Sequence, residues 1–292
     1  MKIIFWSLLL CNLVFAQSLQ IPYHYEILDK TLKDFQPDLS KSNEMYSVSS
    51  VKIGVKEAPF LRVFFDDCNL GNNSYIKMTS FYDGYTQILN TEKLQRWKNS
   101  SMIFNGDTLL VELYESEFDN NINIRFDYLL VGEKNNNQSS GNQGNIKSPD
   151  EIQTICGSDD RVPSDNKAIG RIFPIMCTAW IAPSGQLVTA GHCVESSVNF
   201  TDEIIEFNVP LSKSDGSVQH PGEEDQYLVS EYNYNITKDW AVFNTNVNTE
   251  TGLYPIEGQE AYLGIEKVTS LEKGRKTKKY TNRNIDIIAR FK

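Results

Sequence analysis

Residues 187–193 (Leu-Val-Thr-Ala-Gly-His-Cys) constrain the fold of this chain more than any other stretch. They join the apolar end of a predicted strand to a histidine and a cysteine within one short turn. A second cysteine, Cys177, precedes them, and the segment between contains another apolar run and the turn sequence Pro183-Ser184-Gly185. This order is typical of strand, turn and strand. We therefore expect Cys177 and Cys193 to face each other across a β-hairpin and to form a disulfide.

The two segments, Cys-Thr-Ala-Trp-Ile from Cys177 and Leu-Val-Thr-Ala-Gly-His-Cys, resemble the catalytic-histidine segment of trypsin-like (chymotrypsin-fold) serine proteases. Residues 155–163, 169–174, 206–210 and 226–227 resemble bacterial secreted members of the lysyl-endopeptidase type. The resemblance implies that His192 is a general base that takes the proton of a serine hydroxyl and returns it to the leaving amine. The alternative is a structural histidine beside a disulfide.

Such a histidine needs a carboxylate that orients its ring, and a buried aspartate followed by apolar residues fits that role. Asp239 precedes Trp-Ala-Val-Phe and resembles the Asp-x-Ala-hydrophobic segment of the family. Asp202 and Asp225 are weaker candidates, because each lies among other acidic residues. An ordinary aspartate at a strand end is the alternative for Asp239.

The catalytic serine of the family is missing from this sequence. A nucleophile of this kind lies in a Gly-x-Ser-Gly loop, whose glycines allow two backbone N–H groups to point at the oxyanion. Ser270 is the one serine after Asp239, and it has no glycine neighbours. We therefore expect residues 151–266 to form the first barrel of a truncated trypsin-like domain that is inactive as given. The basic segment 267–292 is interpreted as a non-native or out-of-frame tail.

The N-terminus carries the pattern of a secretory signal peptide. Lys2 precedes an apolar run, and small Ala16 ends it, which predicts a signal peptide over residues 1–16 and a secreted protein. Its removal leaves four cysteines, which are Cys68, Cys156, Cys177 and Cys193, in a compartment where disulfides persist. Cys156 then has either Cys68 or a missing cysteine as its partner. Residues 17–46 show no sustained period and are interpreted as a pro-segment or lead-in.

Residues 47–133 alternate apolar and polar side chains with period two, which predicts an antiparallel β-sandwich. The alternation is cleanest in residues 122–128. Asp83-Gly84 predicts a hairpin turn. Residues 91–99 predict a short helix, on which Leu94 and Trp97 share one face. The polar segment 134–150 is interpreted as a linker. The predicted fold class is therefore all-β, a sandwich followed by one trypsin-like barrel.

The composition narrows the function classes further. A formal net charge of −10 argues against a nucleic-acid surface. No apolar run is long enough to span a bilayer. Apart from His192 and Cys193, no two cysteines or histidines have the short spacing of metal ligands, so neither a metal nor a cofactor is expected. The expected partner is a protein or peptide substrate. A non-catalytic binding or regulatory protein on a protease scaffold, and a carbohydrate-binding sandwich, are the competing interpretations. We also expect a lone half-domain to expose the apolar face meant for a second barrel, and to aggregate.

Overall fold

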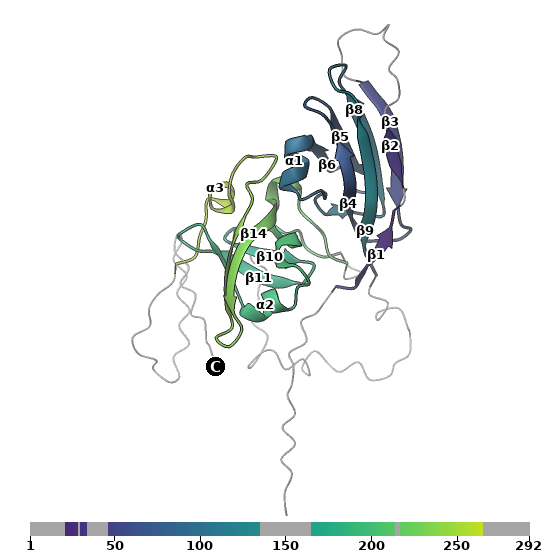
Figure 1. Cartoon of the computed structure of the whole chain (residues 1–292). Coiled ribbons are helices and arrows are strands. Elements are labelled where there is room, and N and C mark those ends of the chain that lie inside the picture. The colour runs from purple at the N-terminus through teal and green to yellow at the C-terminus, as the bar shows by residue number, and fades with distance from the viewer. Residues whose placement is uncertain (1–20, 29, 34–45, 135–164, 214–216, 265–292) are drawn as a thin grey trace, which may run out of the picture.

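The computed structural model describes residues 21–28, 30–33, 46–134, 165–213 and 217–264. These residues form two antiparallel sheets and one closed barrel, so the predicted all-β fold of sandwich plus barrel is confirmed (Figure 1). The predicted signal peptide, the basic segment 267–292, nearly all of the predicted linker, and Cys156 lie outside the described residues. Among the helices that are described, none is long and apolar enough to cross a bilayer.

The N-terminal module is a sandwich of two antiparallel sheets, sheet A and sheet B. Sheet A has the order β1 (Tyr23–Ile27), β9 (Asn123–Gly132), β4 (Phe60–Asn69) and β7 (Phe104–Asn105), and β2 (Thr31–Lys33) also pairs with β9. Sheet B has the order β3 (Tyr46–Gly54), β8 (Thr108–Glu115), β5 (Tyr75–Ser80) and β6 (Thr86–Leu89). Alternate residues of β5 and β8 are buried between the sheets, as the period of two predicts; they include Ile76, Met78, Leu109, Val111 and Leu113.

Two local predictions in this module hold. The helix α1 (Thr91–Arg96) lies inside the predicted range, and the Asn90 side chain caps it by accepting a hydrogen bond from the Lys93 backbone N–H at 2.9 Å. Leu94 and Trp97 are both buried. The Asp83-Gly84 turn joins β5 and β6 as a hairpin, although β5 ends at Ser80 and the intervening loop is longer than two residues.

The segment interpreted as a lead-in contributes to the sandwich. β1 and β2 lie within residues 17–46, and both pair with β9 in antiparallel register. β1 is an edge strand whose last four residues are exposed, so its side chains carry almost no burial pattern. Backbone hydrogen bonds to β9 hold it instead. The sandwich therefore begins before residue 47.

The second module is a closed antiparallel barrel of six strands. Their order is β10 (Ile169–Phe173), β11 (Cys177–Ile181), β12 (Leu187–Thr189), β15 (Trp240–Thr245), β14 (Gln226–Asn235) and β13 (Ile204–Glu206). Two short α-helices accompany it, α2 (Gly191–Glu195) and α3 (Pro255–Gln259), with the 3₁₀ turns η3 (Phe200–Asp202) and η4 (Glu223–Asp225). Its interior is filled by apolar side chains, which include Ile172, Ala179, Leu187, Val229 and Phe243.

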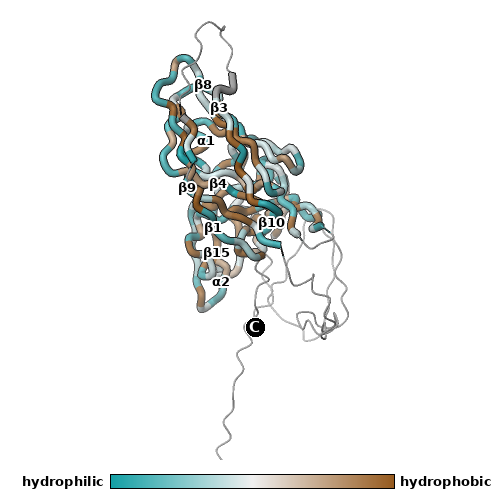
Figure 2. The backbone as a smooth tube through the Cα atoms, turned by 90° about the vertical axis from the view of Figure 1, so that its right-hand side faces the viewer, coloured by the Kyte–Doolittle hydropathy of each residue, from teal (hydrophilic) through white to brown (hydrophobic). Residues whose placement is uncertain are grey.

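The sandwich covers part of the barrel. Phe60 of β4 packs edge-on against Phe173 of β10, with ring centroids 5.0 Å apart. Phe173, Ile204 and Leu228 of the barrel belong to the same buried cluster as the sandwich core. Hydrophobic stretches of β4 and β9 lie in the middle of the molecule, next to β10 (Figure 2). Sheet A therefore covers this part of the barrel surface, while the exposure of the face meant for a second barrel stays a prediction.

A buried polar network lies at the same interface. His220, beside Pro221-Gly222, reads as a turn residue in the sequence, but it is fully buried. Its Nδ1 lies 2.6 Å from Glu206 Oε1, and Arg171 donates two hydrogen bonds to Glu206 Oε2, at 2.7 and 2.9 Å. Its ring lies edge-on to Phe60 and Phe173. This histidine is buried by contacts with residues that are distant in the sequence, so the local sequence does not predict its burial.

Candidate active site

The helix α2 carries His192 and starts directly after β12. Thr189 fixes the end of this strand, because its Oγ1 donates to the backbone oxygen of Thr178 on β11 at 2.9 Å. Gly191 opens the helix against the hairpin of β14 and β15. A Cβ atom on Gly191 would lie 2.8 Å from the Asn235 oxygen and 3.1 Å from the Trp240 backbone nitrogen. Only glycine lets the first turn of α2 approach that hairpin so closely.

This approach brings His192 to Asp239, as the sequence predicts. His192 Nδ1 lies 2.8 Å from Asp239 Oδ1 and 3.1 Å from Oδ2. The backbone N–H of His192 also donates to Asp239 Oδ1, at 3.0 Å. Both the position of the residue and the orientation of its ring are thus tied to one carboxylate.

Asp239 ends the turn between β14 and β15, with a φ of 51°. Aspartate and asparagine tolerate this left-handed conformation better than most residues. Burial alone would raise the pKa of the carboxyl, but the backbone N–H and ring of His192, together with the Gly191 N–H, hold it below its ordinary value. The carboxylate is therefore ionised at neutral pH and suited to accept a hydrogen bond from Nδ1–H of His192.

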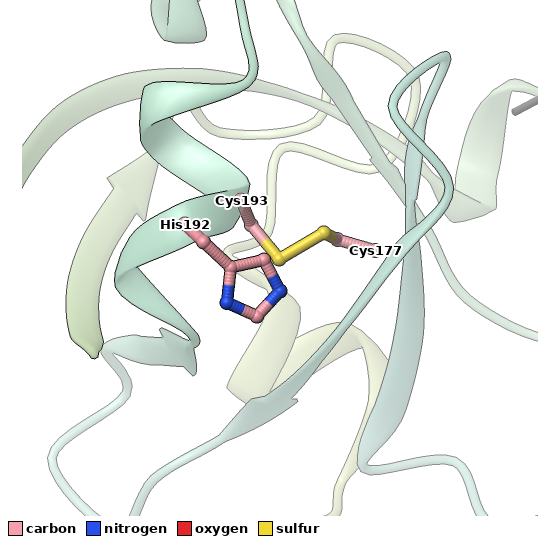
Figure 3. Close-up of side chains that lie close together, drawn as sticks. All are labelled: Cys177, His192 and Cys193. Carbon is pink, nitrogen blue, oxygen red and sulfur yellow. A yellow bond between two sulfur atoms is a disulfide. The ribbon is translucent and has the colours of Figure 1, made fainter. Parts of the chain in front are cut away.

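The predicted disulfide is confirmed. Cys177 on β11 and Cys193 on α2 are bonded, and their Cα atoms are 6.1 Å apart. Figure 3 shows the His192 ring beside this bridge. The two sulfurs and His192 lie within 4.8 Å of one another, but sulfurs that are bonded to each other are not thiolate ligands. The bridge fastens the residue next to His192 to a barrel strand.

The site is more open than the sequence suggested. The side chains of His192 and Asp239 are 61% and 49% exposed, whereas a buried carboxylate was expected. The physical reason is that no described segment covers this side of α2 and the β14–β15 turn. No described residue forms a hydrogen bond with Nε2 of His192, the nitrogen that would face a nucleophile.

The weaker candidates lie elsewhere. Asp202 accepts a hydrogen bond from Asn199, and Asp225 accepts from Asn208 and Gln259. Neither contacts His192. Ser270 lies outside the described residues.

The sequence analysis did not predict Arg62 and Glu203, two buried charged residues between the modules. The signal for Arg62 was present, because a single charge in the apolar run Phe-Leu-Arg-Val-Phe-Phe indicates a strand covered on both faces.

Gly191→Ala is expected to separate Asp239 from His192. The added methyl group collides with backbone atoms that cannot rotate away, so the β14–β15 turn must shift, at a cost of about 1–3 kcal/mol. Loss of the N–H groups then moves the Asp239 pKa up toward its ordinary value. Carboxyl ¹³C NMR titration measures this pKa. Gly264→Ala is the control, because a Cβ there meets open space; an unchanged Asp239 pKa in Gly191→Ala would contradict the packing argument.

Comparison with family models, curated proteins and solved structures found no significant match for this chain. The assignment of the site therefore depends on its own geometry. That geometry is an antiparallel six-stranded barrel, compatible with a chymotrypsin-like fold, in which a disulfide-anchored histidine meets an aspartate.

Proposed function

We propose that this chain carries the histidine and aspartate of a trypsin-like serine endopeptidase, and that the protein is secreted. The observation that carries the proposal is the contact of 2.8 Å between His192 Nδ1 and Asp239 Oδ1, with Nε2 left open. The resemblance of the sequence around Cys177 and His192 to the catalytic-histidine segment of those enzymes supports it. The confirmed disulfide is compatible with an oxidising compartment.

The chemistry follows from the two ring nitrogens. An ionised Asp239 accepts a hydrogen bond from the Nδ1–H group, so the neutral ring keeps its proton on Nδ1 and its lone pair on Nε2. Nε2 removes the proton of a serine hydroxyl as the oxygen attacks the peptide carbonyl, and later gives that proton to the leaving amine. Asp239 stabilises the imidazolium that exists between these steps. Water then hydrolyses the acyl-enzyme with the same base.

The nucleophile has to come from outside the described residues, since none of them bonds to Nε2. The test is to sequence the gene from the codon of Glu266 onward, translate all three frames, and express the longest product. We expect a Gly-x-Ser-Gly loop and cleavage of fluorogenic peptides. In that product, His192→Ala and Asp239→Asn are each expected to lower kcat/KM by about 10⁴-fold.

His24→Ala is a matched control for this experiment. His24 also pairs with a carboxylate, Glu133 Oε1 at 2.9 Å, and is similarly exposed, but it lies on β1 of the sandwich. Its loss is expected to leave kcat/KM unchanged. The proposal fails if the extended gene encodes no such serine loop, or if His192→Ala cleaves peptides as fast as the unaltered protein.

A non-catalytic binding protein on the same scaffold is the second candidate. The observation that favours it is a cavity of about 510 Å³ between the sandwich and the barrel, which is large enough for a small ligand. Failure of the extended product to cleave peptides, with binding at this cavity intact, would select this candidate over the endopeptidase.

A further inference from the structure

The cavity between the two modules has a wall of aromatic rings. Tyr23 and Tyr25 of β1, Phe64 of β4 and Tyr128 of β9 line it from the sandwich side. Phe64 and Tyr128 are stacked with centroids 4.4 Å apart, and Tyr25 meets Tyr128 edge-on at 5.3 Å. The volume of about 510 Å³ is that of a pocket for a small molecule or one amino-acid side chain. Ring faces carry a negative quadrupole that attracts cations.

The opposite wall carries a buried carboxyl group. Glu203, between η3 and β13, is 6% exposed and lines the cavity. Its Oε1 accepts a hydrogen bond from Ser197 Oγ at 2.5 Å. Its Oε2 is buried and has no hydrogen-bond partner among the described residues. A cationic ligand in the cavity would stabilise the ionised form of this buried carboxyl.

Arg62 does not supply the missing donor. Its guanidinium donates to the backbone oxygens of Ser101 and Asp202 and to Ser100 Oγ, and lies 4.7 Å from the Phe64 ring centroid. No ion pair joins it to Glu203 within the described part of the chain. Asp127 and Asp202 also line the cavity, so carboxylates outnumber the single cation. The balance of charge favours a cationic ligand over an anionic one.

We propose that this cavity is a binding site for an organic ammonium ion, whose charge faces the Glu203 carboxyl and whose apolar stem lies against the four aromatic rings. The ion is either a free small amine or the side chain of a lysine in a peptide. Ser196, which follows α2, donates to the backbone oxygen of His192 at 2.7 Å and also lines the cavity. The site therefore lies at the far end of the short helix that carries His192. It is independent of the proposed peptidase activity, because binding is measured without catalysis.

The test is a titration of the chain with benzylammonium, followed by two-dimensional NMR. Saturable binding with a Kd on the order of 1 mM is expected, as for a ligand of this size. Benzyl alcohol, which has the ring without the charge, and phenylacetate, which has the opposite charge, are expected to bind at least about tenfold more weakly. Nα-acetyl-lysine methylamide distinguishes the sources: binding comparable to benzylammonium points to a lysine side chain, and weaker binding to a free aromatic amine.

Glu203→Gln is expected to weaken benzylammonium binding about tenfold or more, since a hydrogen bond to a charged group is replaced by one to a neutral amide. Glu195→Gln is the matched control: it removes the same charge from exposed Glu195 of α2, which does not line the cavity. Tyr25→Leu removes one ring at an exposed position and is expected to weaken binding about threefold. This variant keeps the test decisive if Glu203→Gln does not fold.

The pH adds an independent readout. Burial raises the pKa of Glu203 to about 7, although Ser197 and Arg62 act to lower it. The carboxyl gains its charge between pH 6 and pH 8, so benzylammonium binding is expected to tighten over this range in the unaltered chain and not in Glu203→Gln. The other titratable groups that face the cavity are Arg62 of β4, Tyr23 and Tyr25 of β1, Tyr128 and Asp127 of β9, and Asp202 of η3.

Three results would overturn the proposal. They are an absence of saturable benzylammonium binding at millimolar concentrations, equal affinities for the Glu203→Gln and Glu195→Gln chains, and tighter binding of phenylacetate than of benzylammonium.

Discussion

Replacing Glu206 by alanine is expected to lower the free energy of unfolding by about 3–5 kcal/mol. Glu206 is fully buried and accepts hydrogen bonds from Arg171 through Oε2 and from His220 through Oε1. Burial lowers the pKa of the His220 ring. Burial would raise the pKa of Glu206, but His220 and Arg171 outweigh this effect and hold the pKa of that carboxyl below its ordinary value. The network is thus a carboxylate, a guanidinium and a neutral imidazole. Without Glu206, Arg171 keeps only the Gln219 backbone oxygen, at 2.8 Å, and has no carboxylate to balance its charge, while Nδ1 of His220 loses its partner.

Urea unfolding measures this loss through the shift of the transition midpoint. Glu92→Ala provides the comparison, because Glu92 pairs with Arg96 at 2.6 Å on the exposed face of α1. An exposed pair one helical turn apart contributes only about 0.3–0.5 kcal/mol. Equal losses of unfolding free energy in Glu206→Ala and Glu92→Ala would show that the buried carboxylate stabilises the fold no more than the exposed one does.

Phe60→Ala is expected to cost about 3–5 kcal/mol and to weaken the coupling between the modules. The ring is fully buried between Phe173 and His220. It also covers Gly132 so closely that a Cβ there would lie 2.4 Å from the ring. The truncation therefore leaves a cavity in the part of the core that both modules share.

Two probes of unfolding, tryptophan fluorescence and far-ultraviolet circular dichroism, are expected to report separate transitions in Phe60→Ala but one shared transition in the unaltered chain. Phe118→Ala is the control, since that side chain is 76% exposed, and it is expected to change stability by less than about 0.5 kcal/mol. A single transition with unaltered midpoint in Phe60→Ala would show that the interface contributes little.

The parts of the fold that the sequence predicted are those with a local signal. Alternation in residues 122–128 predicted β9, because every second side chain there enters the sandwich core. The spacing of Cys177 and Cys193 across a predicted hairpin predicted the disulfide, which is confirmed. Asp239 was chosen because apolar residues follow it and because its segment resembles that of the family. The roles of His192 and Asp239 in catalysis stay predictions.

The parts that the sequence did not predict depend on contacts between distant segments. The sequence did not predict β1 because its side chains carry no period of two, and its place in the sheet depends on pairing with β9, a distant segment. His220 looked like a turn residue because Pro221-Gly222 follow it, and its burial depends on Phe60 in the other module. The burial of Glu203 has no local signal, since nothing in the sequence around it shows that the aromatic side chains of β1 and β9 lie opposite.

The side chains of β4 constrain how the two modules can evolve. Leu61 and Val63 fill the sandwich, while Phe60 and Arg62 on the alternate face contact the barrel through Phe173 and Asp202. A sandwich acquired by gene fusion from an unrelated protein would present different side chains on that alternate face and would leave the barrel uncovered. The two modules are therefore expected to have been inherited together, with any substitution on this face of β4 matched by one in the barrel.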